Sequence, residues 1–255
     1  MNMKYFWEYW TDLPRDIGVK TFGPVHIAWV TVSFIIIAST ISLYRRQNAA
    51  IKRRIQMTAA ILMVMGYVIR WIWVAVIGHY SIITMLPLQL CIISVFVEFI
   101  AVISGNIICK EFSYCLGLPG AIVALINPGM GPYPLLSYFY LQFAFAHTIL
   151  ILLPLIWIIV DGYRPSIHRF PQCFGIGMVF LVIAKCVNSM IGSNYMYINY
   201  APEDSILKVF EIQFGNPGYL VPFAFLIIIA WLILYIPWVV MESKKNRIID
   251  YRIAK

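Results

Sequence analysis

The chain has 255 residues, of which 62% are hydrophobic and 12% are charged, and its mean hydropathy is +0.82. A soluble domain of this size cannot hide so much apolar surface, which excludes a water-soluble protein. The net charge of +8 is carried by short loops beside apolar segments. That is the charge pattern of membrane insertion, so the sequence predicts no nucleic-acid partner.

The chain begins with a mixed segment, residues 1–23, in which aromatic side chains alternate with charges. It lacks an apolar core followed by a small-residue cleavage site, so we expect no signal peptide. Its composition predicts an interfacial helix or a lid on the membrane surface. A single bundle is expected over residues 24–241, followed by a basic cytoplasmic tail at residues 242–255.

Apolar runs long enough to cross a hydrocarbon core of about 30 Å recur along the chain. They predict an all-α membrane protein with seven spanning helices, at Pro24–Leu43, Ile55–Gly78, Ile83–Ser104, Phe112–Asn127, Leu136–Val160, Gln172–Ile191 and Tyr219–Met241. The fourth contains Gly117, Pro119 and Gly120, so we expect it to be kinked or partly re-entrant.

The distribution of cations predicts the orientation of these spans. Residues 44–54 carry five cations and no acid, which marks a cytoplasmic loop. With the N-terminus outside and the C-terminus in the cytoplasm, thirteen Lys and Arg residues lie inside, four lie outside and two lie within spans. We therefore expect a multi-pass protein of the cell membrane, most simply the bacterial plasma membrane.

Four spans each carry one reactive or charged side chain at a similar depth. Arg70, Cys91, His147 and Lys185 are expected about 9–17 Å beneath the outer surface. Arg70 and Lys185 are two cations with no carboxylate at their own depth in the membrane, which predicts an anionic ligand, such as a phospholipid phosphate that enters from the outer leaflet. The alternative is that Arg70 and Lys185 extend outward to lipid headgroups without a specific role.

Cys91 and His147 suggest nucleophilic chemistry. A histidine can act as a general base near neutral pH and activate a thiol for attack on a lipid ester. The alternatives are that His147 makes a hydrogen bond between helices and that Cys91 is a small apolar side chain.

Two further candidate polar groups within spans are Glu98 and Asn188. Glu98 lies about 10 Å deeper than Cys91 on the same helix face, where a protonated, hydrogen-bonded carboxyl or a proton relay is expected. Asn188 extends the polar stripe of Lys185. The five cysteines have no CxxC spacing, so we predict neither a disulfide framework nor a metal site, and no cofactor is indicated.

Four segments together resemble a known family. They are Leu86-Pro87-Leu88-Gln89-Leu90-Cys91, the stretch Leu118–Pro128, Ala146-His147 and Gly192-Ser193-Asn194-Tyr195. In this order they resemble the bacterial YwaF-type integral membrane family. The resemblance adds Gln89, Asn194 and Tyr195 to the candidate residues for substrate binding.

That family is similar to a eukaryotic group, the transmembrane protein 164 type. Its members are understood as acyltransferases that remodel ether phospholipids through a cysteine. Their motif has Cys-His directly after the proline, where this chain has Leu88 and Gln89. Cys91 lies one turn later on the same face, and His147 matches the family's histidine of the fifth span.

The resemblance and the residues lead to one leading hypothesis of function. The chain would be a phospholipid acyltransferase or acyl hydrolase with Cys91 as nucleophile, His147 as base, and Arg70 and Lys185 holding the phosphate. The alternatives are a lipid or small-molecule transporter, sensor or binding protein without covalent chemistry, and a structural subunit of a membrane complex. Membrane lipids are the expected partners in each case.

Overall fold

The computed structural model describes the backbone of residues 3–203 and 205–253, and in these ranges every regular element is a helix. The elements in chain order are η1 (Met3–Tyr5), α1 (Pro24–Tyr44), α2 (Ala49–Val76), α3 (Ile82–Met85), α4 (Leu90–Ser104), α5 (Ile107–Phe112), η2 (Ser113–Gly117), α6 (Leu118–Ile126), α7 (Tyr138–Ile159), α8 (Phe170–Ile191), η3 (Tyr195–Tyr197), α9 (Ile206–Phe214) and α10 (Leu220–Ile253). The all-α prediction is confirmed.

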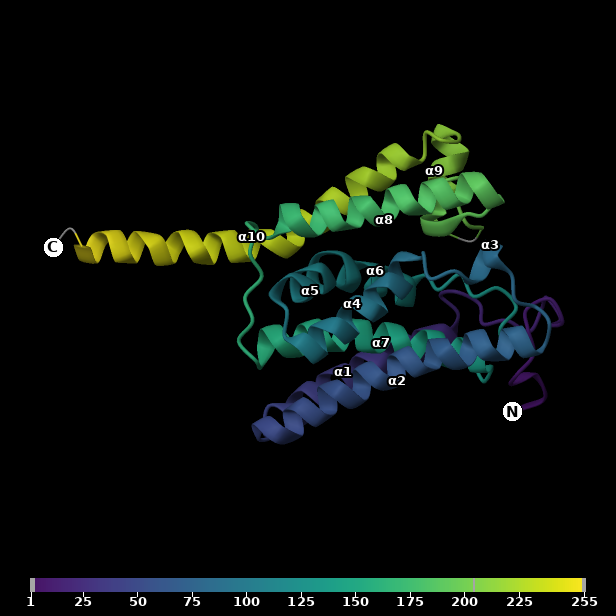
Figure 1. Cartoon of the computed structure of the whole chain (residues 1–255), viewed down its shortest axis with the longest axis horizontal. Helices are drawn as coiled ribbons and strands as arrows, with labels where there is room; N and C mark the ends of the chain where they lie inside the picture. Colours follow the sequence, from purple (N-terminus) through teal and green to yellow (C-terminus); the bar gives the residue numbers. More distant parts are fainter. Residues whose placement is uncertain (1–2, 204, 254–255) are drawn as a thin grey trace.

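The helices form three groups (Figure 1). Helix α7 is largely buried and packs against α1, α2, α4 and α6, so it is the core of the bundle. Helices α4, α5 and α6 lie between α7 and an outer pair, α8 and α10 (Figure 1). We call the end that carries residues 3–23 the N-terminal end, and the end that carries residues 45–48 and 161–169 the basic end.

Six segments of 20–28 residues are long and apolar enough to cross a membrane. They are α1, α2, the run α5–η2–α6, α7, α8 and α10 up to Ser243. Helix α4 has 15 residues and spans about 22 Å, which is less than a hydrocarbon core of about 30 Å. The described chain is therefore a multi-pass membrane protein, and the count of seven spans stays a prediction.

The expected third span is wrong in one respect, because Leu86–Gln89 is not helical. Helix α3 ends at Met85, and α4 begins only at Leu90. Proline has no N–H to donate to a helix and pushes the residue before it into an extended conformation. Leu86, before Pro87, has φ −65° and ψ 147°, and Gln89 is also extended. The break puts a helix start at Leu90, inside the predicted span.

The expected fourth span is helical from Ile107 to Ile126. Its irregularity is η2, a single π-helical turn that ends at Gly117, immediately before the Pro119 turn of α6. Single π turns frequently occur at functional sites. A side chain at Gly117 would lie 3.4 Å from Ser94 on α4, so this glycine lets the two helices approach closely.

The N-terminal segment covers the ends of α2 and α7. Its only regular helix among the described residues is η1, and residues 1–2 lie outside the described ranges. The carbonyl of Phe6 accepts from the Tyr138 N–H at 2.7 Å, and the carbonyl of Trp7 accepts from the Trp73 indole at 2.9 Å. Tyr9 and Leu13 are buried. Residues 3–23 therefore pack onto the bundle, and their place on the membrane surface stays a prediction.

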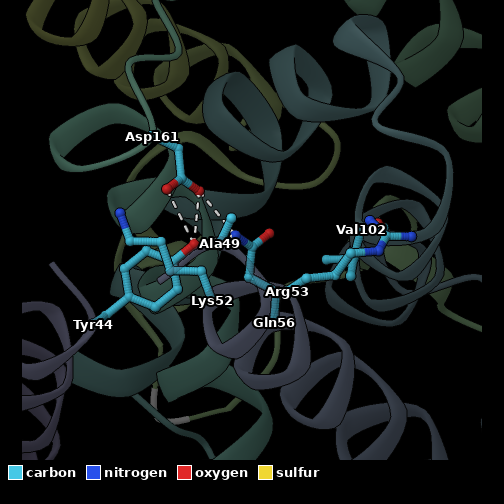
Figure 2. Close-up of a pocket in the computed structure, with 7 residues that line it drawn as sticks. All are labelled: Tyr44, Ala49, Lys52, Arg53, Gln56, Val102 and Asp161. Atoms are coloured by element: carbon cyan, nitrogen blue, oxygen red, sulfur yellow. Dashed lines mark hydrogen bonds between the residues drawn. The ribbon is translucent and has the colours of Figure 1, made fainter. Parts of the chain in front are cut away.

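At the basic end, side chains tie the ends of α1, α2 and α7 together. Tyr44 donates to both oxygens of Asp161, at 3.1 and 2.9 Å, and Gln56 donates to Asp161 at 2.8 Å (Figure 2). Trp157 in turn donates to Gln56 at 2.9 Å. Helix α10 does not end at this level but continues through the predicted basic tail to Ile253, and residues 254–255 lie outside the described ranges.

Candidate functional site

The break between α3 and α4 is held by the tyrosine of the Gly192–Tyr195 segment. The Tyr195 hydroxyl accepts from the Leu86 N–H at 2.8 Å and donates to the Ile82 carbonyl at 2.5 Å. Gln89 adds a second link, because its Oε1 accepts from the Met196 N–H at 3.0 Å. Backbone groups freed by the break thus have partners from a segment more than 100 residues away.

The tyrosine is itself positioned by Asn188, at the end of α8. Asn188 is buried, and its Oδ1 accepts from the Tyr195 N–H at 2.8 Å and from the Ser193 hydroxyl at 2.7 Å. Its Nδ2 donates to the Tyr195 carbonyl at 3.0 Å. All the polar atoms of this side chain are used inside the loop, which indicates a structural role for Asn188.

Asn194 and Lys185 both form hydrogen bonds to Asn199, in the loop that follows α8. Asn194 Oδ1 accepts from the Asn199 N–H at 3.0 Å, and its Nδ2 donates to the Tyr200 carbonyl at 2.8 Å. Lys185 is exposed on α8 and donates to Asn199 Oδ1 at 2.9 Å. Its ammonium is therefore directed to the loop surface.

Arg70 lies on α2 with its guanidinium 5.7 Å from the ring of Phe139. Among the described residues it makes no ion pair and no hydrogen bond, and its Nε is buried without a partner. An unpaired buried donor is costly, so such a group calls for a ligand or ordered water. Of the four side chains predicted to share a depth in the membrane, Arg70 is the charged group that has neither an ion pair nor a hydrogen bond among the described residues.

Cys91 lies in the first turn of α4. Desolvation raises the pKa of the Tyr197 phenol in the adjoining loop, the Cys91 thiol raises it further, and the Arg70 guanidinium acts in the opposite direction. Electrostatic effects of this kind weaken with distance. Cys91 and Arg70 therefore each lie within electrostatic range of Tyr197.

His147 is buried deeper in the bundle. Its Nδ1 lies 2.7 Å from the Phe143 carbonyl, and its ring lies 4.1 Å from the Phe143 ring. Phe139, which contacts Arg70, is eight residues away on the same helix, or about 12 Å. Among the described residues no hydrogen bond joins His147 to Cys91 or Arg70. The predicted meeting of Arg70, Cys91, His147 and Lys185 in one chamber stays a prediction, and their contacts divide them among three places.

A comparison with protein families decides the broader identity. Residues 21–235 match the TMEM164 family. The chain belongs to the TMEM164 family. No curated protein and no solved structure matches it. The matched range contains all four segments on which the resemblance depends, and the contacts above join two of them, Leu86–Cys91 and Gly192–Tyr195. The bacterial YwaF-type assignment stays a prediction.

Glu98 is a second unmet polar group in this TMEM164 family member. It is fully buried on α4, and neither carboxyl oxygen has a partner among the residues that the structure describes. Ser94, one turn earlier, is likewise buried with an unpaired hydroxyl. Both face Gly117, where an added Cβ would lie 3.4 Å from Ser94 and 3.9 Å from a Glu98 oxygen. The carboxyl therefore lies at the π turn, apart from Arg70.

Replacing Glu98 by leucine is expected to leave the free energy of unfolding unchanged or to raise it by about 1–3 kcal/mol. A buried carboxyl without partners is costly, and an apolar side chain of similar size removes that cost. Unfolding in detergent micelles measures the effect. Glu98→Gln is the matched control that keeps the polar group, and marked destabilisation by Glu98→Leu would show that the carboxyl has a bound partner.

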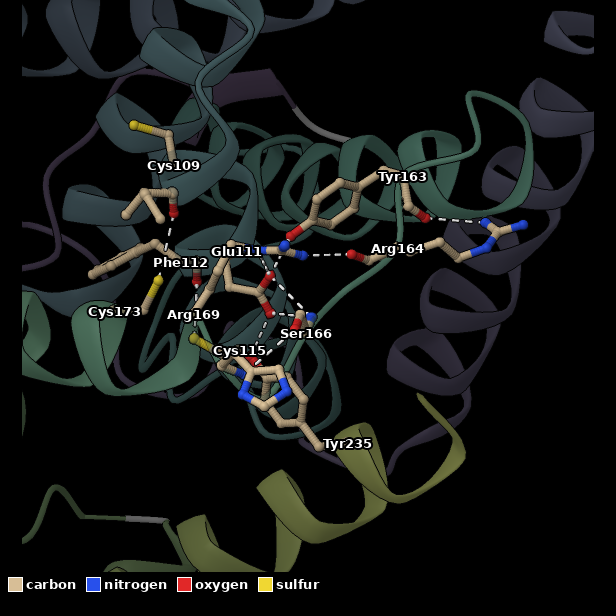
Figure 3. A network of polar contacts seen from close by, with 12 residues as sticks. Cys109, Glu111, Phe112, Cys115, Tyr163, Arg164, Ser166, Arg169, Cys173 and Tyr235 are labelled. Atoms are coloured by element: carbon tan, nitrogen blue, oxygen red, sulfur yellow. Dashed lines mark hydrogen bonds and ion pairs between the residues drawn. The ribbon is translucent and has the colours of Figure 1, made fainter. Parts of the chain in front are cut away.

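Sequence reasoning missed one strongly connected charge, Glu111 on α5. Its carboxylate is fully buried and accepts from Arg169 Nε at 2.7 Å, Tyr163 at 2.5 Å and Tyr235 at 2.6 Å (Figure 3). The N–H of Ser166 donates to both oxygens at 3.2 Å. Desolvation and the neighbouring carboxylate raise the pKa of Tyr163. All these donors point to a structural anchor at the basic end.

Proposed function

We propose that this TMEM164 family member acts on the acyl chain of a membrane phospholipid at the N-terminal end of the bundle, with Cys91 as nucleophile. One observation carries the proposal: the thiol lies in the first turn of α4, directly after the break, and both it and the Arg70 guanidinium, whose Nε has no partner among the described residues, act electrostatically on Tyr197. A phospholipid offers an ester carbonyl for the thiol and a phosphate for the cation, which joins the two groups in one substrate.

The start of α4 favours this chemistry. The N-terminus of a helix stabilises negative charge, including a thiolate. Among the described residues, the N–H groups of Leu90 and Cys91 have no carbonyl partner. Such groups are available to stabilise the oxyanion that forms when a thiolate attacks an ester carbonyl. The break at Pro87 is therefore the feature that creates this helix start within the apolar part of the chain.

The proposed reaction has two steps. The base takes the proton of the Cys91 thiol, the thiolate adds to the ester carbonyl carbon, and the ester C–O bond breaks. The lysophospholipid alkoxide then takes that proton back from the base, which leaves a thioester on Cys91. Water or the hydroxyl of another lysophospholipid then attacks the thioester and regenerates the thiol. His147 is proposed as the base, because its Nδ1 lies 2.7 Å from the Phe143 carbonyl and its Nε2 remains to accept a proton. The proposal therefore requires His147 and Cys91 to come within hydrogen-bond reach, directly or through one water, when the lipid binds.

The test is lipid turnover by the purified full-length protein in vesicles. Phospholipids with a labelled acyl chain are supplied, and released fatty acid, lysophospholipid and transferred chains are measured by mass spectrometry. Cys91→Ala is expected to lower turnover by about a hundredfold or more, since the nucleophile is lost. The matched control is Cys186→Ala, which removes an exposed thiol on α8. Equal turnover in the two variants contradicts the proposal.

A second candidate is lipid binding without covalent chemistry. It is favoured by the lack of a hydrogen bond between Cys91 and His147 among the described residues. In that case Arg70→Gln weakens phospholipid binding, and Cys91→Ala changes neither binding nor any cellular function of the protein. The two candidates are thus distinguished by which of the two variants has an effect.

We further infer seven passes through the membrane, with the N-terminal end outside and the basic end in the cytoplasm. The pass that adds to the six long apolar segments is the third in chain order, and it consists of α3, the break and α4 together. Between Ile82 and Ser104 the chain runs from the N-terminal end of the bundle to the basic end (Figure 1). The concentration of cations at the basic end supports this orientation. Labelling of single cysteines placed at residues 46 and 200 in intact bacteria tests it, and labelling of residue 46 from outside contradicts it.

A further inference from the structure

A surface pocket at the basic end lies far from the Cys91 region. It has a volume of about 230 Å³ and is lined by Tyr44, Ala49, Lys52, Arg53, Gln56, Val102 and Asp161 (Figure 2). Three candidate spans end within two residues of its lining, at Tyr44, Ala49 and Ile159. The pocket therefore lies where the hydrocarbon core gives way to lipid headgroups.

Two cations of the pocket have no acidic partner. Among the described residues neither Lys52 nor Arg53 forms an ion pair. Lys52 lies over the ring of Tyr44, with its ammonium 5.2 Å from the ring centre. Within the described part of the chain, Arg53 donates two long hydrogen bonds, of 3.4 Å, to carbonyls at the end of α4, and no others. Most of the donors of both side chains are thus free to bind an anion, and arginine and lysine are the usual phosphate ligands in proteins.

The opposite wall of the pocket offers an acceptor. The Asp161 carboxylate is exposed and, among the described residues, receives hydrogen bonds from Tyr44 and Gln56 only. Gln56 also lies within hydrogen-bond distance of the Tyr44 hydroxyl and is oriented by Trp157. A carboxylate has about four acceptor positions, so Asp161 keeps capacity for a further donor. Its place is fixed from two helices.

We propose that this pocket binds a phosphate ester that carries an amino group, as the headgroup of a zwitterionic phospholipid of the leaflet at the basic end. Lys52 and Arg53 bind the phosphate, and Asp161 accepts from the ammonium. The volume is below the about 300–1,000 Å³ typical of sites for drug-sized ligands, so it suits a headgroup with its acyl chains outside. The site is independent of the proposed function of Cys91.

The test uses the full-length protein in detergent micelles and native mass spectrometry. Phosphatidylethanolamine, phosphatidylglycerol and phosphatidylcholine are added in turn, and the bound fraction of each is measured. We expect phosphatidylethanolamine to bind best, since it alone combines a phosphate with a primary ammonium. The double variant Lys52→Ala/Arg53→Ala is expected to bind about tenfold more weakly, because two charge-assisted contacts are lost.

A matched control removes two cations of the same region that do not line the pocket, Arg46 and Arg54. Their double alanine variant is expected to bind within about twofold of the parent protein. An equal loss in both double variants would mean general attraction to basic charge and would overturn the proposal. Asp161→Asn is expected to remove the preference for phosphatidylethanolamine over phosphatidylglycerol, and an unchanged preference also contradicts the proposal.

Soluble ligands distinguish the source of the phosphate. Free phosphoethanolamine and inorganic phosphate are titrated into the same samples, and weaker binding of both than of the lipid supports a headgroup. Equal binding of free phosphoethanolamine would assign the site to a soluble metabolite and overturn the lipid assignment. Thermal unfolding of each variant confirms that it is folded. The Cys91→Ala variant should bind as the parent protein does, so failure of one proposal leaves the other intact.

Discussion

Replacing Glu111 by alanine is expected to lower the free energy of unfolding by about 3–5 kcal/mol, which is the usual effect of removing one partner from a buried ion pair. The carboxylate of Glu111 is fully buried, and the change leaves Arg169 without its acid. The hydroxyls of Tyr163 and Tyr235 lose their acceptor as well. Because these donors come from the 161–169 loop and from α10, their loss loosens the outer helix.

The measurement is unfolding in micelles, followed by circular dichroism, together with the accessibility of a single cysteine introduced on α10. Glu111→Gln is the matched variant, because it keeps the shape and an acceptor oxygen but loses the charge. It is expected to be intermediate between the parent protein and the alanine variant. Equal stability of all three would contradict the role of Glu111 as an anchor. Glu98→Leu is the contrasting case, since its carboxyl has no partner to lose.

Local physical rules predicted the helices well. The first predicted span, at residues 24–43, is observed as Pro24–Tyr44, and the sixth ends at Ile191 as predicted. In both cases an apolar run is bounded by residues that stop a helix or mark a membrane boundary, and both signals are local. The basic loop after the first span also contains Asn48, whose side chain caps α2 by accepting from the Ile51 N–H.

Pro87 is a local sequence signal for the break at Leu86–Gln89. Pro87 disfavours a helix before it, yet the apolar run alone predicted a continuous span. The helix is nonetheless interrupted. The freed Leu86 N–H donates to the Tyr195 hydroxyl, and the Gln89 side chain accepts from the Met196 N–H. Those partners lie more than 100 residues away in sequence, so no local pattern could have indicated them.

Glu111 was missed for the same reason. It stands beside Lys110 in a short charged stretch, which has the appearance of an exposed loop. Its partners lie 52 to 124 positions later in the chain. Similarly, the equal depths of Arg70 and Lys185 were predicted from helix rise, but depth says nothing about which way a side chain points. Lys185 is directed to Asn199, a loop residue.

Asn188→Ala is expected to lower the free energy of unfolding by about 3 kcal/mol or more and to reduce lipid turnover or lipid binding as well. Three groups lose their partner, the Ser193 hydroxyl and the N–H and carbonyl of Tyr195, and each unpaired buried group costs about 1–3 kcal/mol. Tyr195 then no longer holds the break, so Cys91 loses its fixed place at the start of α4. Unfolding in micelles and turnover in vesicles measure the two effects.

The neighbouring variant Ser189→Ala is the control, because the Ser189 hydroxyl is exposed and bonds only to the Lys185 carbonyl one turn earlier. It should match the parent protein in both measurements. Tyr195→Phe then distinguishes the effect of the loop from the effect of the break. It keeps the bonds between Asn188 and the Tyr195 backbone and removes the bonds of the Tyr195 hydroxyl to Ile82 and Leu86. If Tyr195→Phe lowers function with little loss of stability, the loop acts by positioning the start of α4. Full function in Tyr195→Phe together with loss in Asn188→Ala would mean that the loop matters only for folding.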